Sequence, residues 1–130
     1  MILGIGIDAV NLNRVEKLSR RTLEKLFHEE ELKEYDNLSN ACIEVKNAFL
    51  ASRFAVKEAY SKAVGHGFDG TVIPKEIRTC KKEGGQPFIV LYGVTKEKAP
   101  VCNIFLSITH EEPLAIAMVV LETGENCGKK

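Results

Sequence analysis

Two carboxylates and one lysine, far apart in the sequence, are the residues best suited to chemistry. Asp8 follows the apolar run from Ile2 to Ile7, which is typical of a buried strand that ends at the carboxylate. Glu58 lies in a segment with helical periodicity, and Lys62 follows it by one helical turn. Mg2+ is a hard cation that binds carboxylate oxygens and takes its remaining ligands from water and substrate phosphates. The three residues therefore predict a Mg2+ site for phosphate chemistry.

Each of these residues also has a structural interpretation. Asp8 could cap the helix that follows the strand. Glu58 and Lys62 could form an i,i+4 ion pair worth about 0.2–0.5 kcal/mol. The combination of all three with the sequence motifs around them favours the functional interpretation.

The composition is that of one soluble globular domain. The chain has 130 residues, 45% hydrophobic and 28% charged, so a single domain is expected over residues 1–130, with residues 124–130 as a frayed tail. Lys and Arg together number 18, as do Asp and Glu, so the chain has no net charge that would attract nucleic acid or a membrane. The first apolar run is too short to span a bilayer and has no basic flank. The spacing of four cysteines favours a reduced, cytoplasmic location: Cys42, Cys80, Cys102 and Cys127.

Helices are predicted in the first half of the chain. Asn11 is the expected N-cap of a helix that runs to about Arg20, and residues 22–36 give one or two shorter helices. A long helix from Asn47 to Val64 is expected to pack one apolar side on the core. Its opposite, front side carries Phe54, Glu58, Ser61, Lys62 and Gly65.

Strands are predicted in the second half. Residues 76–82 and 88–91 flank a glycine-rich turn and indicate one hairpin, and residues 94–99 indicate a short helix. Residues 103–110 and 114–122 indicate a second hairpin, with His110 at its tip. The predicted class is α+β: a mostly antiparallel sheet, with one long helix and shorter helices packed against one face.

Three basic residues lie three and four positions apart in the first predicted helix and its extension, where they would form a ridge: Arg14, Lys17 and Arg21. Such a charge run is usually a solvated face. It could also dock an acidic partner.

The chain resembles the holo-(acyl-carrier-protein) synthases, the small single-copy branch of the 4'-phosphopantetheinyl transferases. The resemblance rests on the opening Gly4-Ile5-Gly6-Ile7-Asp8, on Arg53-Phe54-Ala55-Val56-Lys57-Glu58-Ala59 with Lys62-Ala63, and on Ser107-Ile108-Thr109-His110. It covers nearly the whole chain and the order of the motifs. The segment around Glu58 is the most specific part.

The resemblance implies transfer of 4'-phosphopantetheine from coenzyme A to a serine of apo acyl carrier protein in fatty acid biosynthesis. Adenosine 3',5'-bisphosphate leaves. It implies a homotrimer with each active site between neighbouring subunits. Asp8 and Glu58 would hold Mg2+ against the pyrophosphate, and Arg14, Lys17 and Arg21 would dock the acidic carrier protein. The residues implied to contact coenzyme A are Arg53, Ser61, Lys62, Gly65, Thr109 and His110; Asp8, Glu58, Lys62 and His110 are the implied catalytic residues.

Two questions of mechanism stay open at this point. The serine proton could pass to a water on the metal or to Glu58 through a water, which is the preferred route, or to His110. Several relatives carry basic residues just before the long helix, near the 3'-phosphate of coenzyme A. This chain has Glu44-Val45-Lys46 at those positions, so its contact to the 3'-phosphate stays open. Lys46 and Arg53 are the expected substitutes. Val10 replaces an acidic metal ligand of the larger two-copy branch, so water is expected in that position.

Two other functions fit the same residues. The altered Glu44-Val45 segment is compatible with a binding module for coenzyme A or carrier protein that has lost turnover. A metal-dependent nucleotide hydrolase would use the same carboxylates without any carrier protein.

Overall fold

The computed structural model describes residues 1–124, and the rest of the predicted tail, residues 125–130, lies outside the described part. The predicted α+β class is confirmed. The strands are β1 (Ile2–Asn11), β2 (Ile77–Lys81), β3 (Pro87–Leu91), β4 (Asn103–Glu111) and β5 (Leu114–Glu122). The helices are α1 (Leu12–Glu16), α2 (Arg20–Leu26), α3 (Glu29–Asp36), α4 (Ile43–Val64), the 3-10 turn η1 (Pro74–Glu76) and α5 (Gly93–Glu97). Within residues 1–124, no helix is both long enough and apolar enough to cross a membrane.

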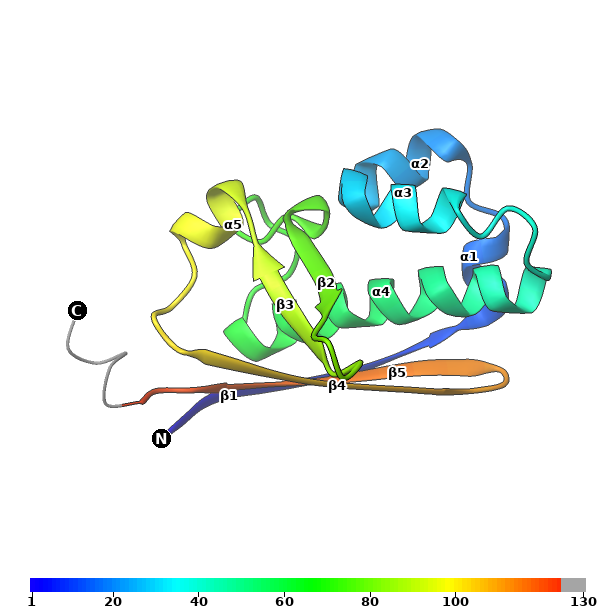
Figure 1. Ribbon diagram of the computed structural model, residues 1–130. Coiled ribbons are helices and arrows are strands. Elements are labelled where there is room, and N and C mark those ends of the chain that lie inside the picture. Colours follow the sequence, from blue (N-terminus) through cyan, green and yellow to red (C-terminus); the bar gives the residue numbers. More distant parts are fainter. Residues whose placement is uncertain (125–130) are drawn as a thin grey trace.

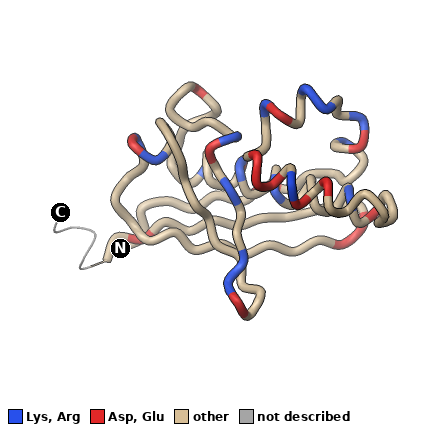
Figure 2. Tube along the Cα trace, turned by 45° about the horizontal axis from the view of Figure 1, so that its top comes forward, with Lys and Arg blue, Asp and Glu red and all other residues tan. Residues whose placement is uncertain are grey.

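The strands form two antiparallel sheets. One has the order β1-β5-β4, and the other is the β2–β3 hairpin. Figure 1 shows the helices and the β2–β3 hairpin on one side of the three-stranded sheet, with its other side uncovered. Figure 2 shows that charged residues are concentrated on the short helices and at the hairpin turn, while the three-stranded sheet carries few.

Helix α4 packs unusually close to β1. A Cβ added at Gly4 or Gly6 would overlap the carbonyl oxygen of Ala63 or Ala59, respectively. The two glycines therefore let the strand touch the backbone of the helix. This contact places Asp8, two residues after Gly6 and on the same side of the strand, beside α4.

Strand β1 differs from the prediction in two ways. It continues beyond Asp8 to Asn11, so the carboxylate lies within the strand rather than at its end. The strand was expected to be buried, but Ile5 and Ile7 are 57% and 58% exposed. They alternate with the inward residues and lie on the uncovered side of the sheet, which explains their exposure.

The first predicted helix is shorter than expected. Asn11 caps α1 as predicted, and its side chain accepts a hydrogen bond from the amide of Asn13. The helix ends at Glu16 instead of continuing to Arg20. The hydroxyl of Ser19 accepts from the amide of Thr22 and starts α2, so the local capping preference of serine competes with continuation of α1.

The long helix is also different in detail. It starts at Ile43, four residues before the predicted Asn47, and ends as predicted at Val64, with Gly65 in a left-handed conformation at φ 83°. The predicted front of this helix is only partly open: Phe54 and Ser61 are buried, whereas Glu58 is half-buried and Lys62 and Gly65 are exposed. The three-stranded sheet, β2, α1 and α3 pack around α4, so most of its sides face other elements rather than water.

Candidate active site

Asp8 and Lys62 meet between β1 and α4. The Nζ atom of Lys62 lies 2.9 Å from Oδ1 of Asp8 and donates a second hydrogen bond of 3.1 Å to the carbonyl oxygen of Ile7. The Asp8 side chain is 17% exposed, so the ion pair is partly shielded from water. Neither structural interpretation of these residues holds: Asn11 caps α1 in place of Asp8, and Lys62 reaches across to Asp8.

Glu58 shares this electrostatic environment. Burial raises the pKa of Glu58, and the like charge of Asp8 raises it further. Arg14 and Lys62 lower the pKa of the same carboxyl. The two carboxylates thus act on each other, and two cations partly compensate their charge.

The two carboxylates fit a magnesium ion. Their repulsion is relieved by a cation, and carboxylate oxygens are hard ligands. No group of three or more His, Cys, Asp or Glu residues within residues 1–124 is arranged to hold a metal. Such a sparse protein ligand set suits Mg2+ bound together with a phosphorylated substrate, because that ion keeps several water or phosphate ligands.

We expect single substitutions to move the pKa of Glu58 in opposite directions. Asp8→Asn removes a repelling negative charge and should lower this pKa, whereas Lys62→Met removes an attracting positive charge and should raise it. Carbon-13 NMR titration of glutamate-labelled, metal-free protein measures both shifts. Lys17→Met is the control, because Lys17 is not among the charges that shift the pKa of Glu58. Equal pKa shifts in all three variants would contradict the assigned effects of Asp8 and Lys62.

The predicted basic ridge is not a feature of one helix. Arg14 lies in α1, Lys17 is its C-cap, and Arg21 belongs to α2. All three are exposed. Arg14 additionally lies over the ring of Phe54, with its guanidinium carbon 5.4 Å from the ring centre, and it acts on Glu58. Arg14 therefore belongs to the carboxylate cluster as well as to the basic surface.

A second region, which we call the Arg53 pocket, lies on another side of α4. It encloses about 610 Å³. Its walls come from α3, α4, the turn of the β2–β3 hairpin and β4, and include Glu34, Phe49, Arg53, Lys81, Pro87 and His110.

The guanidinium of Arg53 stacks on Phe49, with 4.1 Å between its central carbon and the ring centre. Burial lowers the pKa of Arg53, and its Nε atom is buried without a hydrogen-bond partner among residues 1–124. Arg53 lines the pocket, so its guanidinium can donate to an anion bound there.

The structure divides the predicted site residues between these two regions. At about 100° per residue, Arg53 lies about 140° around the axis of α4 from Glu58. Asp8 and His110 point to the same side of the sheet but lie on its opposite edge strands, β1 and β4. Thr109 alternates with His110 and lies on the uncovered side, so one protomer cannot close one pocket with both.

Ser61 and Gly65 lie close to the carboxylate cluster along the helix. The Ser61 hydroxyl is buried and donates a 2.7 Å hydrogen bond to the carbonyl oxygen of Glu58, so its proton is already engaged. Gly65 ends the helix, and a Cβ at this position would meet open space. The structure gives Ser61 a role within the helix and leaves Gly65 accessible.

Comparison with known proteins decides the family. The model of the 4'-phosphopantetheinyl transferase superfamily matches residues 4–119. The chain belongs to this superfamily. The match includes β1 with Asp8, α4 with Glu58 and Lys62, and β4 with His110. Both the carboxylate cluster and the Arg53 pocket therefore lie within the matched transferase domain.

Individual members of the transferase superfamily are similar over almost their full length. A holo-(acyl-carrier-protein) synthase of a Geobacillus species is 38% identical over 125 residues, which cover 94% of this chain and 98% of the relative. The crystal structure of the Bacillus anthracis synthase, in complex with CoA (3',5'-ADP), has a TM-score of 0.81 at 36% identity and covers 95% and 99% of the two chains. The Helicobacter pylori synthase in complex with coenzyme A has a TM-score of 0.75 at 29% identity, with 91% and 99% covered.

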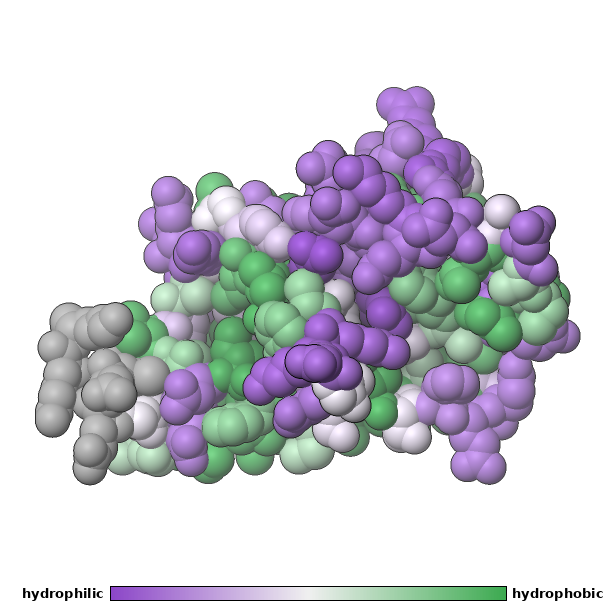
Figure 3. Space-filling view, in the orientation of Figure 1, coloured by the Kyte–Doolittle hydropathy of each residue, from purple (hydrophilic) through white to green (hydrophobic). Residues whose placement is uncertain are grey.

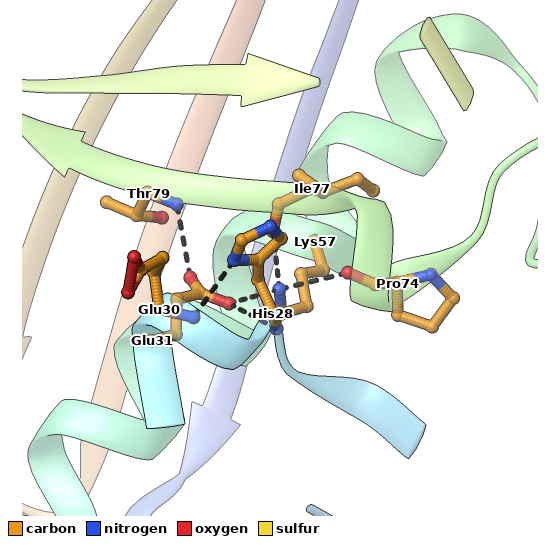
Figure 4. Close-up of polar contacts among 7 residues, drawn as sticks. All are labelled: His28, Glu30, Glu31, Lys57, Pro74, Ile77 and Thr79. Atoms are coloured by element: carbon orange, nitrogen blue, oxygen red, sulfur yellow. Dashed lines mark hydrogen bonds and ion pairs between the residues drawn. The ribbon is translucent and has the colours of Figure 1, made fainter. Parts of the chain in front are cut away.

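One feature of this transferase domain was not predicted from the sequence. Lys57 and Glu31 form an ion pair of 2.7 Å in which both side chains are fully buried (Figure 4). Lys57 directly precedes Glu58, but on the helix it points toward α3 and β2. Its place in a largely apolar helix was the only signal in the sequence, because the partner lies 26 positions away.

Proposed function

We propose that the chain is a magnesium-dependent holo-(acyl-carrier-protein) synthase that acts as a homotrimer in the cytoplasm and supports fatty acid biosynthesis. It transfers 4'-phosphopantetheine from coenzyme A to a serine of apo acyl carrier protein and releases adenosine 3',5'-bisphosphate. The observation that carries the proposal is the cluster of Asp8, Glu58 and Lys62 in a transferase-family chain.

The carboxylate cluster suits the reacting phosphates. Asp8 and Glu58 would hold Mg2+, which when bound supplies positive charge to the pyrophosphate. The ammonium of Lys62, already 2.9 Å from Asp8, can extend that positive field toward a phosphate oxygen. Attack on the β-phosphate needs positioning and charge neutralisation above all, and these groups offer both.

The serine proton of the carrier can pass to Glu58 through a water. Glu58 lies in the cluster with Asp8 and Lys62, where the pyrophosphate would react, so its carboxylate is placed to accept the proton from that water. His110 lies on the other edge strand and lines the Arg53 pocket, so within one protomer it is poorly placed as the base for the same water. We therefore assign the binding of coenzyme A to His110 and the acceptance of the serine proton to Glu58.

The Arg53 pocket suits the adenosine bisphosphate end of coenzyme A. Arg53, Lys81 and His110 offer donors to phosphate, and Phe49 offers an aromatic wall. Arg53 takes the place of the basic residues that Glu44 and Val45 do not provide.

A homotrimer explains why the two regions are separated. If the carboxylate cluster of one subunit faces the Arg53 pocket of the next, each cleft is complete. The uncovered side of the sheet offers an apolar surface for this contact: Leu3, Ile5, Ile7, Phe105 and Met118 are all exposed. Figure 3 shows hydrophilic side chains gathered over α2 and α3, and hydrophobic ones along the lower left edge, where the sheet lies. Sedimentation equilibrium should give the mass of three chains.

The basic residues of α1 and α2 suit an acidic carrier protein. Lys17→Glu should lower kcat/KM for the carrier about tenfold at low salt, with less effect at high salt, because rim charges act through association. The KM for coenzyme A should not change. Steady-state kinetics at two ionic strengths measures this effect, and Lys25→Glu on α2 is the matched control. Equal losses in both variants would show that only net charge matters.

The decisive experiment uses coenzyme A, Mg2+ and an apo acyl carrier protein with the purified chain. Mass spectrometry should show the carrier gaining one phosphopantetheine, and a carrier with its serine replaced by alanine should gain nothing. Saturable binding of coenzyme A without this gain would instead support a binding module. Release of the bisphosphate without carrier protein would support a hydrolase.

A further inference from the structure

The buried ion pair of Lys57 and Glu31 uses nearly all of its hydrogen-bonding capacity. The Nζ atom of Lys57 donates to Oε1 of Glu31, to the carbonyl oxygen of Pro74 at 2.9 Å and to that of Ile77. Oε2 of Glu31 accepts from the amide of Thr79 at 3.1 Å. An ammonium has three donors, so Lys57 is fully satisfied.

This arrangement joins four separate segments. Lys57 belongs to α4 and Glu31 to α3, while Pro74 opens η1 and Ile77 and Thr79 belong to β2. Figure 4 shows the lysine reaching between Glu31 and the chain at Pro74 and Ile77. Replacing a buried ion pair by apolar residues often leaves stability unchanged or increases it, so stability alone is a weak explanation for such a pair.

The β2–β3 hairpin takes part in two of these hydrogen bonds, at Ile77 and Thr79. It forms its own two-stranded sheet in the described chain, and an isolated two-stranded hairpin is at best marginally stable. Its turn, with Lys81, Gly85 and Pro87, forms one wall of the Arg53 pocket. Helix α3 forms another wall with Glu34, joined by Leu38 just after the helix ends, and α4 forms a third. The pair thus joins three of the four elements that line this pocket, β4 being the fourth.

We propose that Lys57 and Glu31 are positioning residues that hold the β2–β3 hairpin against α3 and α4 and thereby set the affinity of the Arg53 pocket for coenzyme A. The proposal rests on the proposed function, in which this pocket receives the adenosine bisphosphate end of that substrate. Neither residue touches the substrate. Their effect passes through the backbone groups of Ile77 and Thr79.

Two variants and one control test this role. Glu31→Gln keeps the shape of the side chain but removes its charge and one acceptor for the Thr79 amide. The double variant Glu31→Leu with Lys57→Met removes both buried charges and the hydrogen bonds of the pair to β2, so it guards against a failure of the first variant to fold. Val119→Ala, in the buried centre of β5, is the control for general loss of packing, with thermal melting used to compare stability.

Hydrogen exchange and kinetics are measured on the same samples. Both test variants should show faster exchange over residues 77–91, and a KM for coenzyme A raised about tenfold with kcat nearly unchanged, because binding rather than chemistry is affected. The control should show neither effect. Exchange no faster than in the control would overturn the positioning role, and a loosened hairpin with unchanged KM would overturn the link to coenzyme A. Failure of the unsubstituted protein to bind coenzyme A would instead refute the proposed function and with it that link, while the exchange comparison would still decide whether the pair holds the hairpin.

Discussion

Glu58→Gln should reduce kcat for carrier modification by about 10²–10³-fold or more, as expected for the loss of a charge that stabilises the transition state. The amide has nearly the shape of the carboxylate but neither binds Mg2+ well nor accepts the serine proton. Asp8 and Lys62 would remain paired, so the cluster should keep its geometry. Mass spectrometry of the carrier, sampled over time, measures the rate.

The same substitution should leave the fold intact. The pKa of Glu58 is higher in the folded protein than its ordinary value, so the folded state holds this proton more tightly than the unfolded state does. Stability therefore falls as the pH rises through that pKa range, and a neutral amide should not lower the melting temperature at neutral pH. Glu44→Gln, on an exposed residue in the first turn of α4, is the control. A wild-type rate in Glu58→Gln would remove this residue from the mechanism.

Gly6→Ala should destabilise the protein by at least about 3 kcal/mol, because the new Cβ would overlap the backbone oxygen of Ala59. Neither partner is a flexible side chain, so the strand or the helix must move as a whole. That movement would also separate Asp8 from Glu58 and Lys62, so the folded fraction should lose transfer activity. Chemical denaturation and the carrier assay at low temperature measure the two effects.

Gly67→Ala is the matched control for this substitution. A Cβ at Gly67 meets nothing within 4 Å, and its φ angle lies outside the left-handed region. The same chemical change should therefore alter stability by less than about 1 kcal/mol. Similar losses for the two variants would show that the close contact between β1 and α4 is not the cause.

The sequence predicted the carboxylate cluster because its members belong to strongly patterned elements. An apolar strand and a long helix fix Asp8, Glu58 and Lys62 locally, and packing of the two elements then brings them together. The element types and both hairpins were predicted for the same reason. The helix boundaries were predicted less accurately: Cys42 makes no side-chain cap at the start of α4, so no residue type marks where that helix begins.

The remaining features depend on tertiary contacts that no local pattern encodes. The rotation of α4 decides that Glu58 and Arg53 face different regions, and helical periodicity gives only their relative angle. The pairing of Lys57 with Glu31 joins two helices through a buried contact that charge spacing alone does not reveal. The exposure of Ile5 and Ile7 likewise depends on which side of the sheet the helices cover.

Helix α4 carries the Glu58 side of one cleft and the Arg53 side of another, and under the proposed trimer this has a genetic consequence. Two inactive chains, one altered at Glu58 and the other at Arg53, should complement each other when they are co-expressed. Random mixing in a closed ring would leave roughly one cleft in four with both intact partners. A mixed population would then outperform either parent, whereas chains altered at the same residue would gain nothing from mixing.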